Sequence, residues 1–200
     1  MNAKDCSCAC SSQALGNEDR RKVLRLAAGG LVAGLTLAGR SAQAAAPVAR
    51  VVPGDLLVED DADGEPTPLK LADLKPGKPL LAFPFDAAKK QPRSETRLNK
   101  VVLIRFAESE LDARLKAVSA GGVLAFSSVC THNGCDVKTW MAKEQVLACF
   151  CHGSKFAPTQ AGAVMGGPAP RPLPLLPLAL KGDTLVIAGD FTAPPGYAPA

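Results

Sequence analysis

Short apolar runs separated by turn-forming residues dominate the chain beyond residue 50. The most continuous run, VVLIRF over 101–106, predicts a buried strand, and shorter runs predict strands over 56–58, 79–83, 123–128, 145–150 and 183–189. Only 108–119 has helical spacing, with Leu111, Leu115 and Val118 on one face. The 18 Gly and 17 Pro indicate many turns, so the pattern predicts a mainly β fold with one short helix.

Composition adds limits on size and partners. A chain of 200 residues with 47% hydrophobic residues suits one domain with its own core, with or without appendages. The net charge of +4 comes largely from residues 1–44, where six Lys and Arg oppose three Asp and Glu. The remainder carries only +1, so its charge gives no indication of a nucleic-acid partner.

The N-terminal segment 1–44 has the pattern of an export signal. Basic residues precede an apolar stretch from Leu26 to Gly39, and small residues suited to cleavage follow. Fourteen helical residues span roughly 21 Å, less than the roughly 30 Å of a bilayer core, which favours a cleaved signal over a retained short membrane anchor. Arg20 and Arg21 resemble a twin-arginine signal. Cys6, Cys8 and Cys10 lie upstream and could bind a metal, but a discarded leader is the preferred interpretation.

Two short loops concentrate the chemistry of the chain. CTHNGC over 130–135 and CFCHGS over 149–154 contain four of the seven cysteines and both histidines. Two thiolates and two imidazoles suffice for one metal site, and a structural zinc is one candidate. The single residue between Cys130 and His132 is a tighter spacing than zinc fingers use, and a zinc site would leave two cysteines over.

Both motifs closely resemble the two boxes of Rieske [2Fe-2S] proteins of the cytochrome bc type. The resemblance continues through GGPAP over 166–170 and covers about 123–189. It implies an all-β fold, in which an antiparallel sheet scaffold over 45–200 carries an inserted cluster-binding subdomain of about 130–170.

The resemblance also implies the roles of the loop residues. Cys130 and Cys149 would hold one iron of a single [2Fe-2S] cluster, and His132 and His152 would hold the other. Replacing two thiolates by neutral imidazoles raises the reduction potential to somewhere in roughly −150 to +300 mV. Cys135 and Cys151 would form a disulfide between the loops, which an oxidising compartment would preserve.

Further residues around the cluster follow from the same resemblance. Ser154 occupies the position whose hydroxyl donates to a bridging sulfide. Phe156 replaces a tyrosine donor, which predicts a potential below that of a typical quinol-oxidising subunit. Gly134 and Gly153 are expected to let backbone N–H groups approach the cluster, and Gly167 and Pro168 belong to a stiff loop that covers it.

The resemblance implies electron transfer, with substrate chemistry on a redox partner protein rather than on this chain. One partner class is a quinol-oxidising cytochrome bc-type complex, favoured by GGPAP and the disulfide. The other is a periplasmic oxidoreductase of the arsenite-oxidase type, slightly preferred because Asn133 replaces an apolar residue and Phe156 lacks a donor. The expected location is the periplasm or the periplasmic face of the cytoplasmic membrane, and a retained N-terminal segment is the alternative that would give membrane association. A zinc or redox-sensing module is the remaining alternative.

Overall fold

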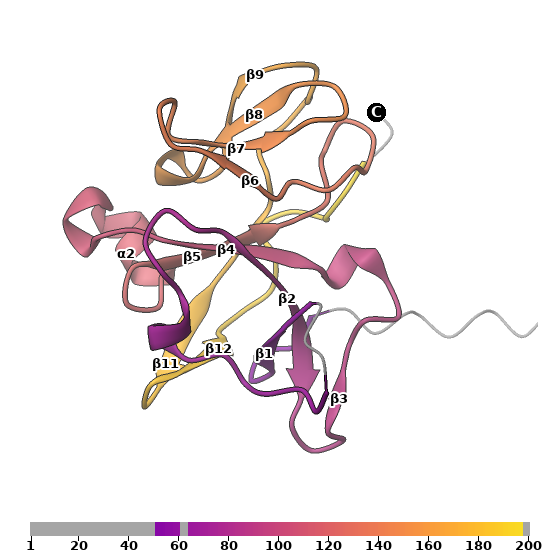
Figure 1. Ribbon diagram of the computed structural model, residues 1–200, viewed down its shortest axis with the longest axis vertical. Helices are drawn as coiled ribbons and strands as arrows, with labels where there is room; N and C mark the ends of the chain where they lie inside the picture. Colours follow the sequence, from indigo (N-terminus) through magenta and orange to yellow (C-terminus); the bar gives the residue numbers. More distant parts are fainter. Residues whose placement is uncertain (1–50, 61–63, 198–200) are drawn as a thin grey trace, which may run out of the picture. The chain divides into compact units, whose positions relative to one another are not determined.

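The computed structural model describes residues 51–60 and 64–197 (Figure 1). The predicted signal segment 1–44, with Cys6, Cys8 and Cys10, therefore lies outside the described residues. Within the described part, none of the helices combines the length and the apolar character that crossing a membrane requires. The strands are β1 Leu56–Glu59, β2 Leu80–Asp86, β3 Gln91–Pro92, β4 Val101–Arg105, β5 Val123–Ser127, β6 Thr139–Met141, β7 Val146–Cys149, β8 Ser154–Ala157, β9 Ala163–Gly166, β10 Leu175–Leu176, β11 Leu178–Lys181 and β12 Thr184–Ile187, and the helix is α2 Ala113–Val118.

The larger sheet is the scaffold of the fold. Its eight strands run in the order β10-β5-β4-β2-β1-β12-β11, with β3 paired to β2, and each pairing between named strands is antiparallel. The apolar strands β4 and β5 lie side by side, in a register that places Val102 opposite Phe126. Both strands are almost wholly buried, which agrees with the continuous apolar runs from which they were predicted.

The smaller sheet has the order β6-β7-β8-β9 and lies above the scaffold in Figure 1. All three pairings are antiparallel, and the register of β8 with β9 shifts between Lys155 and Phe156, which leaves Met165 of β9 without a partner in the register. This sheet forms from residues inserted between β5 and β10 of the scaffold. The sequence-based prediction of an antiparallel β scaffold with an inserted subdomain is therefore confirmed.

Two hydrophobic cores cover opposite faces of strand β5. Leu124 and Phe126 belong to the first core, which also includes Leu147 and Phe156 of the smaller sheet. Val123 and Ala125 belong to the second core, inside the scaffold. Side chains of a strand point alternately to its two faces, so β5 separates the two cores. The first core joins the smaller sheet to the scaffold.

The helix predicted over 108–119 is shorter than expected. Residues Glu108–Glu110 form a 3-10 turn, and the α-helix begins only at Ala113. Leu111 between them has extended backbone angles, with φ −101° and ψ 138°. The Asp112 carboxylate accepts the Leu115 N–H at 2.7 Å and so caps a new helix at this point.

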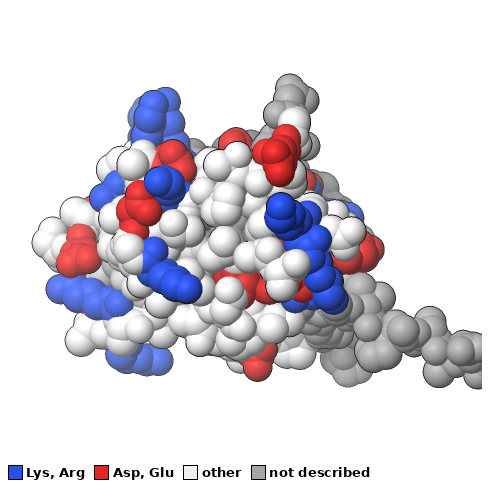
Figure 2. Space-filling view, turned by 90° about the horizontal axis from the view of Figure 1, so that it is seen from below, with Lys and Arg blue, Asp and Glu red and all other residues white. Residues whose placement is uncertain are grey.

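Charged side chains of both signs are intermingled on the face shown in Figure 2. Ion pairs among the described residues include Lys100 with Asp60 and Lys155 with Glu144. A mixed face of this kind lacks the one-sign field that attracts nucleic acid, in agreement with the small charge of the chain beyond residue 44.

Candidate metal centre

The scaffold and the smaller sheet each place one cysteine at the site. Cys130 comes three residues after β5 ends, and Cys149 is the last residue of β7. Both side chains are free thiols and are buried, each only 1% exposed. Burial, with the Cys130 thiol close by, raises the pKa of Cys149. Formation of the Cys149 thiolate is therefore favoured by a nearby positive charge, such as a metal ion.

The two histidines lie together at the same end of the smaller sheet. The ring centroids of His132 and His152 are 4.7 Å apart, with an angle of 83° between the ring planes. His152 is exposed, whereas His132 is partly buried. The Nδ1 atom of His132 is buried and has no hydrogen-bond partner. A buried imidazole nitrogen without a partner is suited to bind a metal.

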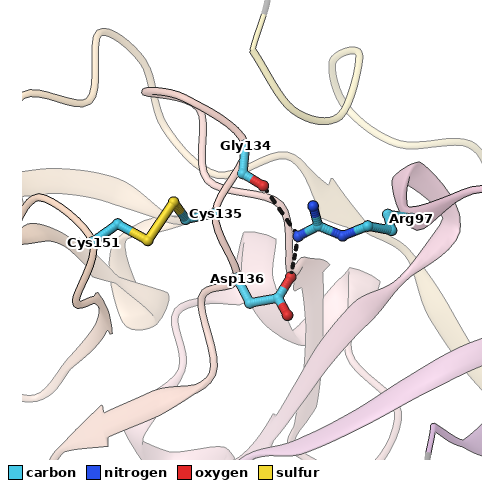
Figure 3. The surroundings of a disulfide bond; sticks show 5 residues. All are labelled: Arg97, Gly134, Cys135, Asp136 and Cys151. Carbon is cyan, nitrogen blue, oxygen red and sulfur yellow. Dashed lines mark hydrogen bonds and ion pairs between the residues drawn. A yellow bond between two sulfur atoms is a disulfide. The ribbon is translucent and has the colours of Figure 1, made fainter.

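Cys135 and Cys151 form a disulfide that joins the first loop to the second (Figure 3). The pairing expected from the resemblance is thus confirmed. The sulfur atoms of Cys135, Cys149 and Cys151 lie within 4.8 Å of one another, so the disulfide borders the buried thiol. Because Cys135 and Cys151 are oxidised, they are not available as thiolate ligands.

An arginine of the scaffold holds the first loop next to this disulfide (Figure 3). The Nη2 atom of Arg97 lies 2.5 Å from the Asp136 carboxylate and 3.1 Å from the Gly134 carbonyl oxygen. Gly134 and Asp136 are the neighbours of Cys135 on either side. Arg97 therefore contacts the residues on both sides of a disulfide cysteine, one through its backbone and the other through its side chain.

Gly134 and Gly153 occupy equivalent turns in the two loops. Their φ angles are +75° and +77°, a region in which side chains cause strain. The Gly134 N–H donates to the Cys130 carbonyl at 2.9 Å, and the Gly153 N–H donates to the Cys149 carbonyl at 3.0 Å. These two N–H groups close the turns. The expectation that the glycines let backbone N–H groups approach the cluster stays a prediction.

A third loop packs directly on the second. A Cβ atom at Gly167 would lie 2.5 Å from the Gly153 carbonyl oxygen and 2.6 Å from the Ser154 nitrogen. Pro168 follows, and Arg171 further along accepts a hydrogen bond on its carbonyl from the Thr131 hydroxyl at 2.7 Å. The third loop therefore contacts both cysteine-containing loops. That Gly167 and Pro168 cover the cluster stays a prediction.

Two further side chains named from the sequence are fully buried. Ser154 and Phe156 are each 0% exposed, at the start and in the middle of β8. The Ser154 hydroxyl has no hydrogen-bond partner, as expected for a donor whose acceptor belongs to a cofactor. Ser128, which sequence reasoning did not single out, is also fully buried with an unpartnered hydroxyl. Apart from its position two residues before Cys130, nothing in the sequence distinguishes this serine.

The side chains of the two loops are suited to bind a metal cluster. They do not form a hydrogen-bonded network in which every polar atom has a protein partner. Two buried thiols and two imidazoles come from two loops, and the His132 nitrogen and the Ser154 hydroxyl lack partners. Buried polar atoms normally have partners, so unpartnered polar atoms within the two loop motifs indicate a group that supplies the partners. Fold and site together define an all-β iron–sulfur protein in which histidines accompany the cysteines.

Comparisons with known proteins assign the family. The model of the Rieske [2Fe-2S] domain matches residues 84–177. A putative respiratory nitrate reductase Rieske subunit of Haloferax mediterranei is 35% identical over 67% of this chain and 58% of its own length. The cytochrome bc1 complex Rieske iron–sulfur subunit of Streptomyces lividans is 30% identical over 72% of this chain and 86% of its own length.

Among solved structures, the cyanobacterial plasma membrane Rieske protein PetC3 from Synechocystis PCC 6803 is 27% identical over 60% of this chain and 95% of that chain, with a TM-score of 0.41. The chain belongs to the Rieske [2Fe-2S] family. Membership implies one [2Fe-2S] cluster, in place of the zinc considered from the sequence. The chain spans only 58% of the haloarchaeal relative.

Proposed function

We propose that Cys130 and Cys149 bind one iron of the cluster and that His132 and His152 bind the other. The unpartnered Nδ1 atom of His132 and the two buried free thiols support this assignment. When bound, the cluster accepts and releases one electron at a time. The chain supplies two thiolate and two imidazole ligands, and the disulfide and Arg97 hold the loops that carry them.

The function we infer is that of an electron-transfer subunit that exchanges electrons with a partner protein through the histidine end of the site. The difference in burial between the ligands carries this inference: the cysteines are 1% exposed, whereas His152 is exposed. Phe150, between the second loop's first two cysteines, is 72% exposed. An exposed aromatic beside an exposed ligand is suited to contact with another protein.

Substrate chemistry is assigned to a partner subunit. Both histidines of the chain are already in the cluster site, so no other imidazole remains for acid–base catalysis. The relatives from Haloferax mediterranei and Streptomyces lividans carry the names of respiratory-complex subunits, which supports a respiratory complex as the setting.

The kind of complex divides into two candidates. Asn133 and Phe156 favour an oxidoreductase with a separate catalytic subunit, and the nitrate reductase relative supports this class without supporting arsenite oxidase in particular. The cytochrome bc1 relative supports the second candidate, a quinol-oxidising subunit. We retain the first as the preferred function.

We place the protein on the periplasmic side, exported by the twin-arginine-like segment 1–44. The disulfide supports an oxidising compartment, because thiols in the bacterial cytosol are kept reduced. Fusing residues 1–50 to a reporter that is active only after export, with Arg20 and Arg21 replaced by Lys as the control, tests this placement. Export that persists in the Lys variant would contradict the twin-arginine assignment.

Low-temperature EPR of the purified protein tests the function. The reduced protein should give the rhombic signal of a cluster with imidazole ligands, and Cys130→Ser, Cys149→Ser, His132→Asn and His152→Asn should each abolish it. Asn133→Ala, a change of a neighbouring residue that is not a proposed ligand, should retain the signal. A signal that appears with dithionite but not with ascorbate favours the first candidate, and reduction by ascorbate or a quinol favours the second. Bound zinc without a signal would refute the ligand assignment.

A further inference from the structure

Two adjacent serines at the end of β5 differ in the state of their hydroxyl groups. Ser127 and Ser128 are both 0% exposed. The Ser127 hydroxyl accepts a hydrogen bond from the Val129 N–H at 3.1 Å. The Ser128 hydroxyl is buried and has no partner. Ser128 therefore has a donor that the protein itself does not use.

The strand places this unused donor on the side of the cluster. Leu124 and Phe126 face the core that contains Cys130 and Cys149, whereas Val123 and Ala125 face the other core. The Ser128 N–H donates to the Lys100 carbonyl at 3.0 Å, which continues the pairing of β5 with the segment before β4. The alternation of side chains then puts Ser128 on the same face as Leu124 and Phe126.

The backbone around Ser128 is fixed on both sides. Its carbonyl accepts the Val137 N–H at 2.7 Å, from a residue just beyond the first cluster loop. Two residues of extended chain span at most about 7 Å, so Ser128 lies close to Cys130. A buried hydroxyl without an acceptor destabilises a fold, and alanine would avoid that cost at this position.

We propose that the Ser128 hydroxyl donates a hydrogen bond to a sulfur atom of the bound cluster or of its Cys130 ligand, and thereby raises the reduction potential. A donor to sulfur stabilises the more negative, reduced cluster. The proposal rests on the ligand assignment of the proposed function. It makes Ser128 a tuning residue that acts in addition to Ser154.

The test compares the midpoint potentials of purified, cluster-loaded variants. Each potential is measured by a redox titration in which EPR detects the reduced cluster. Ser128→Ala should retain iron, sulfide and the EPR signal but titrate at a lower potential than the wild-type protein. Ser128→Thr keeps the hydroxyl and should titrate near the wild-type potential. Ser127→Ala is the matched control: it removes the acceptor of the Val129 N–H, so it should lower the urea midpoint and leave the potential unchanged.

A second readout keeps the proposal testable if one variant loads poorly. Transfer of the wild-type protein into D₂O should shift the iron–sulfur stretching bands in resonance Raman spectra, and the part of that shift due to Ser128 should be lost in Ser128→Ala. Equal potentials and equal D₂O shifts for Ser128→Ala and wild type would overturn the proposal. Absence of the cluster from the wild-type protein would instead refute the proposed function, so the two failures are distinguishable.

Discussion

Gly167 lies against the backbone of Ser154, so closely that a Cβ atom would come within 2.5 Å of the Ser154 Cα atom. The contact joins the third loop to the loop that carries Cys149 and His152. The Ser154 backbone cannot move away easily, because Ser154 is paired with Cys149 at the start of β8. The third loop thus approaches the cluster loops as closely as a backbone without a side chain permits.

Replacing Gly167 by alanine should separate these loops. Its φ of +81° adds backbone strain to the steric conflict. We expect Gly167→Ala to lose the cluster at lower urea concentrations than wild type. Cluster loss is measured as the decrease in visible absorbance. The control is Gly166→Ala, because a Cβ at Gly166 meets nothing within 4 Å. Equal stability of the two variants would show that the close contact is unimportant.

Removing the disulfide should weaken the site without removing a proposed ligand. Cys135 and Cys151 are 16 residues apart, and closing a loop of that size stabilises a fold by about 3 kcal/mol. The double variant Cys135→Ser/Cys151→Ser should therefore load its cluster but bleach at a lower urea midpoint. Treating the wild-type protein with a reductant able to open the disulfide should have the same effect. An unchanged midpoint in the double variant would contradict this role.

The Arg97 contacts should contribute little to global stability. Arg97 is 60% exposed and Asp136 is 31% exposed, and exposed ion pairs contribute about 0–1 kcal/mol. Arg97→Ala should leave the urea midpoint nearly unchanged but speed hydrogen exchange at the amides around Cys135, measured by mass spectrometry. Arg97→Lys can contact only one of the two acceptors well and should give an intermediate rate. Exchange at the wild-type rate in Arg97→Ala would show that the loop is held by the disulfide alone.

Asp86 should make the free energy of unfolding depend on pH in the acid range. The Lys89 N–H donates to its carboxylate at 3.1 Å and lowers the pKa of Asp86, and the Arg93 charge lowers this pKa further. Because the folded pKa is below the unfolded value of 3.8, the contribution is present above that pH and disappears as the pH falls through the folded pKa. Asp86→Asn should thus be less stable than wild type at pH 7, and the difference in urea midpoint should shrink below about pH 4. A difference that does not vary with pH would contradict this.

The sequence predicted the strands that have continuous apolar runs, β7 of the smaller sheet among them, and it missed the more polar strands β8 and β9. Strand β4 follows directly from VVLIRF, whereas β8 (SKFA) and β9 (AVMG) contain Ser, Lys or Gly and are only four residues long. Such strands form because β7 supplies a pairing template and Phe156 packs into the core, which are tertiary effects absent from local pattern.

The candidate ligands could be predicted because cysteine and histidine are common metal ligands and all four lie in two short motifs. Ser128 could not, because a serine near the end of a strand is unremarkable until its hydroxyl is seen to be buried without a partner. The contacts of Arg97 were also out of reach, since they join positions 37 and 39 residues apart. Long-range polar contacts leave no periodic signal in the chain.

The core that contains Cys130 and Cys149 draws residues from both sheets. Relative motion of the two sheets would break that packing, because a close-packed core resists continuous deformation. The two sheets, with the cluster site between their loops, are therefore expected to move as one rigid body. A change in the electron-transfer distance between the cluster and a partner protein would then require the whole body of described residues to move relative to that partner. Bending between the two sheets would not supply it.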